Sequence, residues 1–206
     1  MTDTNKNIEE LEVVTIRFAG DSGDGMQLTG NQFSDNTALF GNDLTTLPDF
    51  PAEIRAPAGS LAGVSSFQMQ FSSKDVHTPG DSLDVLVAMN PAAFKVHLPD
   101  LKENGMLIDN TANYSPKNLK LAGYEESPLE DEGLLEKYKV IQVDMTDLVM
   151  KTLEDMSDLN AKSKVRCTNM FALGLLYWLY ERDMKSSIDF LEKKFKSKPN
   201  IVEANT

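Results

Sequence analysis

The chain has 206 residues, of which 41% are hydrophobic and 25% charged, and this composition fits one sizeable globular domain. Its formal net charge of −12 argues against nucleic acid or an anionic membrane surface as the main partner, because both require basic surfaces. One cysteine, Cys167, excludes an internal disulfide or a cysteine-held iron–sulfur cluster within this chain. The start of the chain is polar and acidic, unlike a secretory signal, and no apolar run reaches membrane-spanning length. We expect a cytoplasmic protein with a disordered leader over residues 1–10 and no metal centre of its own.

The first predicted element is a buried strand over residues 13–19, which are rich in β-branched and aromatic side chains. Three glycines, Gly20, Gly23 and Gly25, then allow a sharp turn. Apolar and small residues recur after Gly25 at spacings of three and four, which predicts a helix that ends near Gly41. In α/β domains a strand, a glycine turn and a helix open a ligand crevice, because free N–H groups and the positive helix end face it.

The glycine spacing does not match a nucleotide fingerprint. A dinucleotide fingerprint that starts at Gly23 needs glycine where Leu28 stands, and a Walker loop needs lysine where Asn31 stands. Asp21 and Asp24 would repel a polyphosphate unless they turn away or accept hydrogen bonds from the turn's own N–H groups. The pattern leaves a ligand loop and a purely structural turn open, and it disfavours a classical nucleotide site.

The next segments are a short strand and a proline-rich loop. Residues 43–47 predict the strand, and residues 48–59 predict a loop held in extended conformation by three prolines. This loop carries Glu53 and Arg55 among small residues. Loops on a rigid scaffold often hold functional groups, and the alternative is an exposed connection with a weak surface ion pair.

The middle of the chain predicts more strands. Alternation over residues 65–71 predicts a strand with one buried face, and residues 84–89 predict a central strand buried on both faces. Asn90 caps the helix that follows, Pro99 divides this helical region, and Gly105 closes it.

Two further strands, over residues 106–109 and 138–143, flank a polar, acidic stretch at 115–137 that predicts an exposed excursion. A helix is expected over residues 145–156. For the basic cluster that follows, a solvated loop is favoured over an anion site; its residues are Lys162, Lys164 and Arg166.

The last third of the chain is helical. Thr168 is predicted to cap the strongest helix, over residues 168–181, which has few polar positions and is expected to be buried nearly all round. A helix with inward-facing residues over 188–195 follows, and residues 200–203 begin another, which suggests a fragment of a longer chain. Together these elements predict a single α/β domain: a Rossmann-like, three-layer, doubly wound and mostly parallel sheet.

Four segments follow one another along the chain: residues 17–25 (RFAGDSGDG), 51–55 (PAEIR), 84–90 (DVLVAMN) and 169–174 (NMFALG). In this order they resemble one family, the gamma domain of the 2-oxoacid:ferredoxin oxidoreductases. The resemblance covers roughly residues 12–206 and is strongest to the amino-terminal part of the alpha subunit of the 2-oxoglutarate type, in which gamma and alpha parts are fused. It implies that residues 11–206 are a gamma (pyruvate/ketoacid oxidoreductase catalytic-type) domain.

The resemblance implies coenzyme A-dependent oxidative decarboxylation of a 2-oxoacid, 2-oxoglutarate being favoured, with electrons passed to ferredoxin. Thiamine diphosphate, Mg²⁺ and iron–sulfur clusters would lie on other domains or subunits, so the implied partners are the thiamine diphosphate-binding alpha and beta parts. The gamma domain would contribute to the coenzyme A site and to subunit contacts, and the isolated chain would be inactive. No catalytic residue is assigned here, and the residues implied to line the shared site are Gly20, Asp21, Ser22, Gly23, Asp24, Gly25, Glu53 and Arg55.

This chain departs from the family pattern in two places. Many relatives have glutamine where Asp24 stands, which leaves a direct phosphate-binding role of the turn open, and paired glycines are missing after Arg55. Two other hypotheses stay open. One is a structural module that docks its 168–181 helix on a partner. The other is a stand-alone dinucleotide-dependent dehydrogenase in which Asp49 would bind the ribose; Leu28 at the third glycine position weakens it, and an exposed loop position is favoured for Asp49.

Overall fold

The computed structural model describes residues 10–53 and 55–206, so the predicted leader lies outside the described residues except for Glu10. They form a six-stranded sheet in the order β2-β3-β1-β4-β5-β6. The strands are β1 (Val13–Asp21), β2 (Asp43–Asp49), β3 (Val64–Ser72), β4 (Leu83–Ala88), β5 (Leu101–Asn110) and β6 (Lys139–Val143). Strands β1, β4, β5 and β6 pair in parallel, and β3 runs antiparallel to both of its neighbours.

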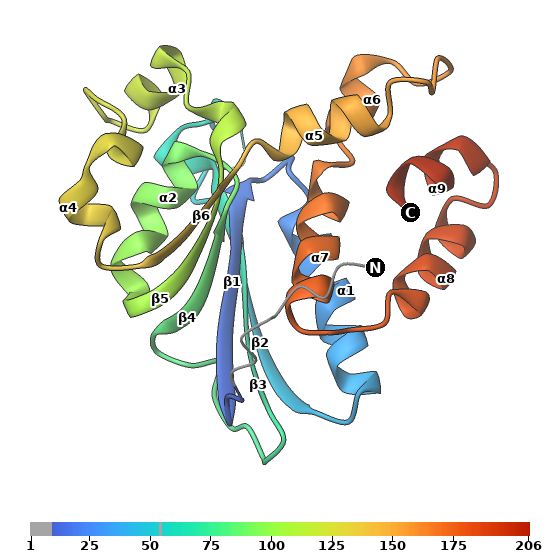
Figure 1. Cartoon of the computed structure of the whole chain (residues 1–206), viewed down its shortest axis with the longest axis horizontal. Coiled ribbons are helices and arrows are strands. Elements are labelled where there is room, and N and C mark those ends of the chain that lie inside the picture. Colours follow the sequence, from blue (N-terminus) through green and yellow to red (C-terminus); the bar gives the residue numbers. More distant parts are fainter. Residues whose placement is uncertain (1–9, 54) are drawn as a thin grey trace, which may run out of the picture.

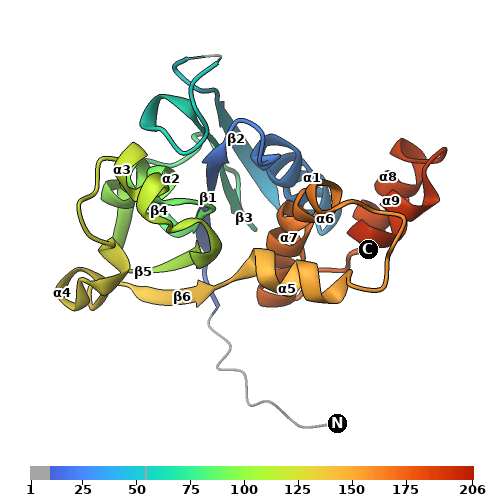
Figure 2. The same ribbon diagram turned by 90° about the horizontal axis from the view of Figure 1, so that it is seen from above.

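Helices cover both faces of this sheet (Figure 1). On one face lie α1 (Met26–Leu39), α5 (Met145–Thr152), α7 (Thr168–Leu179) and α8 (Lys185–Lys194), and on the other lie α2 (Pro91–His97), α3 (Pro116–Leu121) and α4 (Glu132–Leu135). Figure 2 shows the same three layers from above. The remaining helices are α6 (Ala161–Val165) and α9 (Pro199–Asn205), with 3-10 turns at Leu61–Gly63, Leu98–Asp100, Thr111–Asn113 and Pro128–Glu130.

The fold class is therefore confirmed as a doubly wound, mostly parallel three-layer α/β domain. The chain leaves β1 for α1 on one face and leaves β4 for α2 on the opposite face (Figure 1). Strands β1 and β4 are neighbours, so their carboxyl ends form the switch point at which ligands bind in open α/β sheets.

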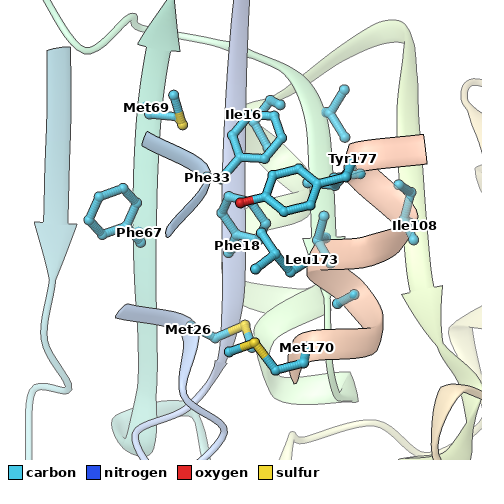
Figure 3. Close-up of a cluster of buried hydrophobic side chains, with 14 of the residues drawn as sticks. Ile16, Phe18, Met26, Phe33, Phe67, Met69, Ile108, Met170, Leu173 and Tyr177 are labelled. Carbon is cyan, nitrogen blue, oxygen red and sulfur yellow. The ribbon is translucent and has the colours of Figure 1, made fainter. Parts of the chain in front are cut away.

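The larger core lies between the sheet and the helices α1 and α7, where Ile16 and Phe18 of β1 face Phe33 and Tyr177 (Figure 3). The rings of Phe33 and Tyr177 stack with their centroids 5.8 Å apart. The Tyr177 hydroxyl has a polar partner in this core, since it lies 3.1 Å from the Gln32 carbonyl. A second core on the other face packs around Leu86, Phe94 and Leu107.

Strand β3 does not have the single buried face that its alternation predicts. Ser66 and Gln68 are each 2% exposed, because α2 covers the polar face as α1 covers the apolar one. Gln68 is paired there: its Oε1 accepts from Arg17 Nε at 3.0 Å, and its Nε2 donates to the carbonyls of Pro79 and Gly80. Burial of this face is possible because every buried polar group on Gln68 is satisfied.

The helical region predicted up to Gly105 ends earlier. Helix α2 stops at His97, a 3-10 turn containing Pro99 follows, and β5 starts at Leu101. Proline has no N–H for the helix, so the chain leaves it there. Gly105 instead lies within β5 beside a register shift, where Asn104 adopts a φ of 61°.

Several smaller predictions also need correction. Residues 115–137 form short helices whose Leu119 and Ala122 are buried, so this stretch is only partly an exposed excursion. Thr168 is the first helical residue and not the cap, and its hydroxyl donates to the Val165 carbonyl at 2.7 Å. Trp178 is 59% exposed on a helix that was expected to be buried nearly all round. The helix predicted over residues 145–156 ends earlier, since α5 stops at Thr152. The basic cluster predicted as a solvated loop instead includes helix α6, on which Lys164 is buried. Among the described residues, no helix combines the length and apolarity of a membrane span.

Candidate functional site

The glycine turn, residues 20–25, lies at the carboxyl end of β1, as predicted. Its shape is fixed by its own aspartates: Asp24 Oδ2 accepts from Asp21 N–H at 2.8 Å, and Asp24 N–H donates back to the Asp21 carbonyl at 2.9 Å. Gly25 has a φ of 78°, which favours glycine, and a Cβ there would lie 2.5 Å from Asn169 Nδ2. A Cβ on Gly20 would lie 2.8 Å from Asp24 Oδ2. Two of the glycines are thus required by close packing around the turn.

The loop over residues 50–63 is tied to the glycine turn by two hydrogen bonds. Asp21 Oδ2 accepts from the Gly59 N–H at 2.8 Å, and Ser22 N–H donates to the Gly63 carbonyl at 3.2 Å. Within the loop, Glu53 N–H donates to the Ala62 carbonyl at 3.2 Å. The structure therefore brings together the two segments that carry the predicted site residues.

Glu53 and Arg55 themselves are exposed on this loop. No ion pair joins them or engages either side chain within the described part of the chain. The surface ion pair considered as the alternative to a functional loop is absent there, and Arg55 is exposed at the carboxyl edge of the sheet.

Burial changes the acidity of both aspartates in the turn. It raises the pKa of Asp24 to about 6, the Asp21 N–H opposes the rise, and the neighbouring Asp21 charge adds to it. Burial also raises the pKa of Asp21, and the Gly59 N–H and the Asn90 amide oppose this. Asp21 Oδ1 and Asn90 Nδ2 are nevertheless buried without a partner within hydrogen-bond distance among the described residues. The turn holds two carboxyl groups where a phosphate would have to sit.

A substitution at Asp24 tests whether burial of its charged carboxyl group destabilises the fold. Because the pKa of Asp24 in the folded protein exceeds its ordinary value of 3.8, the protonated group favours the fold at low pH, and this contribution is lost as the pH rises through about 6. Asp24→Asn keeps an acceptor for the Asp21 N–H and removes the charge. We expect urea unfolding to show a gain of about 1–2 kcal/mol at pH 8 that disappears toward pH 4.

Asp75→Asn, at an exposed carboxylate, is the matched control and should change stability little at either pH. A loss of stability at pH 8 in Asp24→Asn would contradict the assigned burial of the charge.

Sequence reasoning missed a third carboxyl group at the same edge of the sheet. Asp109, at the end of β5, is fully buried, and its Oδ1 accepts from the Tyr114 hydroxyl at 2.7 Å. Burial raises its pKa to about 7, although the Tyr114 hydrogen bond lowers it. Its other oxygen has no partner among the described residues. The carboxyl end of a buried parallel strand was the signal that could have found it.

The topology weighs against a classical dinucleotide site. Asp49 does end β2, but β3 lies between β1 and β2, so this residue is not on the strand next to the glycine turn. Across the described residues, no group of three or more His, Cys, Asp or Glu side chains is arranged to hold a metal ion.

Comparison with known proteins gives a family and a set of relatives. The model of the pyruvate ferredoxin/flavodoxin oxidoreductase family matches residues 15–206. Over 197 residues the chain is 53% identical to the 2-oxoglutarate oxidoreductase subunit KorA of Mycobacterium tuberculosis strain H37Rv, which covers 96% of this chain and 30% of that protein.

Among solved structures, the chain is similar to the 2-oxoglutarate:ferredoxin oxidoreductase from Magnetococcus marinus, which was solved with 2-oxoglutarate, coenzyme A and succinyl-CoA bound. The TM-score is 0.70 at 25% identity, over 95% of this chain and 30% of that one. The pyruvate oxidoreductase subunit PORC from Thermotoga maritima has a TM-score of 0.59 at 16% identity, over 95% and 92% of the two chains, and shows the shared fold alone. The chain thus spans 30% of the length of its curated relative.

Proposed function

This chain belongs to the pyruvate ferredoxin/flavodoxin oxidoreductase family, and we propose that it is the gamma domain of a 2-oxoglutarate:ferredoxin oxidoreductase. In this proposal it assists coenzyme A-dependent oxidative decarboxylation by contributing to the coenzyme A region and to subunit contacts. The identity to a 2-oxoglutarate oxidoreductase subunit and the similarity to an enzyme solved with coenzyme A support it. Thiamine diphosphate, Mg²⁺ and the iron–sulfur clusters are proposed to lie on other parts of the complex, with the alpha and beta parts as partners.

The observation that carries the coenzyme A role is the exposed Arg55 on a loop fixed at the carboxyl edge of the sheet. Coenzyme A presents phosphate groups, and a guanidinium binds phosphate in bidentate fashion. The glycine turn fits a phosphate less well, because its own carboxyl groups occupy it. The residues of this chain therefore favour a site in which Arg55 provides the cation and other parts of the complex provide the rest.

Arg55→Ala in the complete complex tests the proposal. Loss of one charge-assisted phosphate contact should raise the KM for coenzyme A about tenfold and leave kcat nearly unchanged. Steady-state kinetics with varied coenzyme A and saturating 2-oxoglutarate measure both constants.

The matched control is Lys74→Ala, which removes an exposed cation beyond the far end of β3 and should leave the KM for coenzyme A unchanged. An unchanged KM in Arg55→Ala would favour a structural docking module instead. Decarboxylation of 2-oxoglutarate by the purified chain alone would contradict the assignment as an assisting domain.

A further inference from the structure

Three of the backbone N–H groups that the glycine turn could offer to an anion are already engaged within the protein. The Asp21 N–H is bound by Asp24 Oδ2, the Asp24 N–H by the Asp21 carbonyl, and the Ser22 N–H by the Gly63 carbonyl. Two half-buried carboxyl groups also lie at this position, and their charge disfavours an anion there. The acidic side chains therefore favour a role in the turn other than anion binding.

The Asp21 carboxyl group has such a role, because it forms a hydrogen bond with the 50–63 loop. Its Oδ2 accepts from the Gly59 N–H at 2.8 Å, across 38 positions in the sequence. Gly59 is buried and has a φ of 82°, so the backbone of the loop turns sharply at this residue. Asp24 in turn holds the Asp21 backbone through its two hydrogen bonds.

The two ends of the same loop are fixed by other contacts. At its start, the Gln27 amide donates to the Asp49 carbonyl at 3.0 Å and to the Ser66 carbonyl at 2.8 Å. At its end, the Gly63 carbonyl accepts from Ser22 N–H. Between these points the hydrogen bond from the Gly59 N–H to the Asp21 carboxyl group connects the sheet to the middle of the loop, four residues after Arg55. We call this hydrogen bond the tether.

We propose that Asp21 is a positioning residue: it fixes the 50–63 loop over the carboxyl edge of β1 and so places the Arg55 guanidinium. A carboxylate acceptor makes a stronger hydrogen bond to a backbone N–H than a neutral acceptor does. The tether forms within this chain and does not depend on any partner, whereas its use in placing Arg55 for coenzyme A rests on the proposed function.

Limited trypsin digestion of the full chain tests the tether without any activity assay. Trypsin cleaves after Arg55 only when the loop opens locally, so the cleavage rate reports the opening equilibrium. Asp21→Asn should accelerate cleavage of the Arg55–Ala56 bond about fivefold to tenfold. Asp21→Ser, which shortens the side chain, should give an equal or larger increase and serves if Asp21→Asn is poorly folded.

Two controls isolate the loop from global unfolding. Cleavage after Lys196, which is exposed beyond α8, should proceed at the wild-type rate in each variant. Asp24→Asn, which leaves the Asp21 carboxyl group and its hydrogen bond from the Gly59 N–H in place, should leave cleavage after Arg55 near the wild-type rate. Equal rates at Arg55 in the wild type and in both Asp21 variants would overturn the tether.

Kinetics of the complete complex separate this inference from the proposed function. Asp21→Asn should raise the KM for coenzyme A several-fold with kcat unchanged, and the double variant with Arg55→Ala should be no worse than Arg55→Ala alone. Independent, additive effects would overturn the positioning role. Faster trypsin cleavage combined with an unchanged KM in Arg55→Ala would leave the tether standing and contradict the coenzyme A role.

Discussion

Gly30→Ala is expected to lower the free energy of unfolding by about 2–3 kcal/mol, although alanine is the better helix former. A Cβ at this position would lie 2.1 Å from Cδ1 and 2.8 Å from Cβ of Phe67. Phe67 is 2% exposed on β3, so its ring has no free space into which to move. Relief of the clash requires α1 to move away from the sheet. Urea unfolding of the two proteins measures the difference.

Gly174→Ala is the matched control, since it makes the same substitution inside another helix of the same layer. Outside the neighbouring residues and the backbone of α7 itself, no atom of the described residues lies within 4 Å of a Cβ built on Gly174. This variant should therefore gain about 0.5–1 kcal/mol from helix propensity. The two substitutions are expected to have opposite signs. A gain in stability in both would show that α1 does not approach β3 as closely as the structure has it.

Arg17→Ala is expected to destabilise the fold by about 3 kcal/mol, because it breaks a largely buried polar network between β1, β3 and α2. Arg17 donates to Gln68 Oε1, lies 2.8 Å from His97 Nδ1, and pairs with Asp100. Its side chain is 13% exposed, so solvent cannot replace the lost contacts at Gln68 and His97. The exposed pair of Lys102 with Asp84 is the control, and Lys102→Ala should cost less than about 1 kcal/mol.

The same network gives a signature in the pH dependence. Burial, and secondarily the Arg17 charge, lower the pKa of His97 to about 4 from its ordinary value of 6.5. The unfolded chain therefore takes up a proton first, and His97 makes the fold less stable as the pH falls from 6.5 toward 4. Arg17→Ala removes one cause of the shift, so its acid-induced loss of stability over this range should be smaller than that of the wild type. An equal or larger loss would contradict the assigned contact.

Most of the sheet was predictable from the sequence because its strands carry local signals. The β-branched run at 13–19 and the apolar run at 84–89 each identify a strand without knowledge of its neighbours. The burial of Gln68 was not predictable, because its partners Arg17 and Gly80 come from separate parts of the chain. The strand start at Leu101 was missed for a similar reason: residues 102–104 are polar, and only the pairing of Leu101 with Leu83 of β4 shows that the strand begins there.

The candidate site, too, was predictable from the sequence only in part. The glycine turn could be placed at the end of β1, since strand, turn and helix follow one another directly in the sequence. The partner of Asp21 is a backbone N–H at Gly59, and a backbone donor leaves no trace in residue identity. The sequence raised the question of whether the aspartates bind the turn's own N–H groups, and the structure shows that Asp24 does so while Asp21 reaches the loop.

We propose that this chain contributes to the coenzyme A region through Arg55 and not through the glycine turn. A structure of the complete complex with coenzyme A bound is the first measurement to make. We expect a phosphate oxygen about 3 Å from the Arg55 guanidinium, with Asp21 still bound to the Gly59 N–H. A coenzyme A phosphate bound to the N–H groups of residues 20–25, with Arg55 facing solvent, would contradict it.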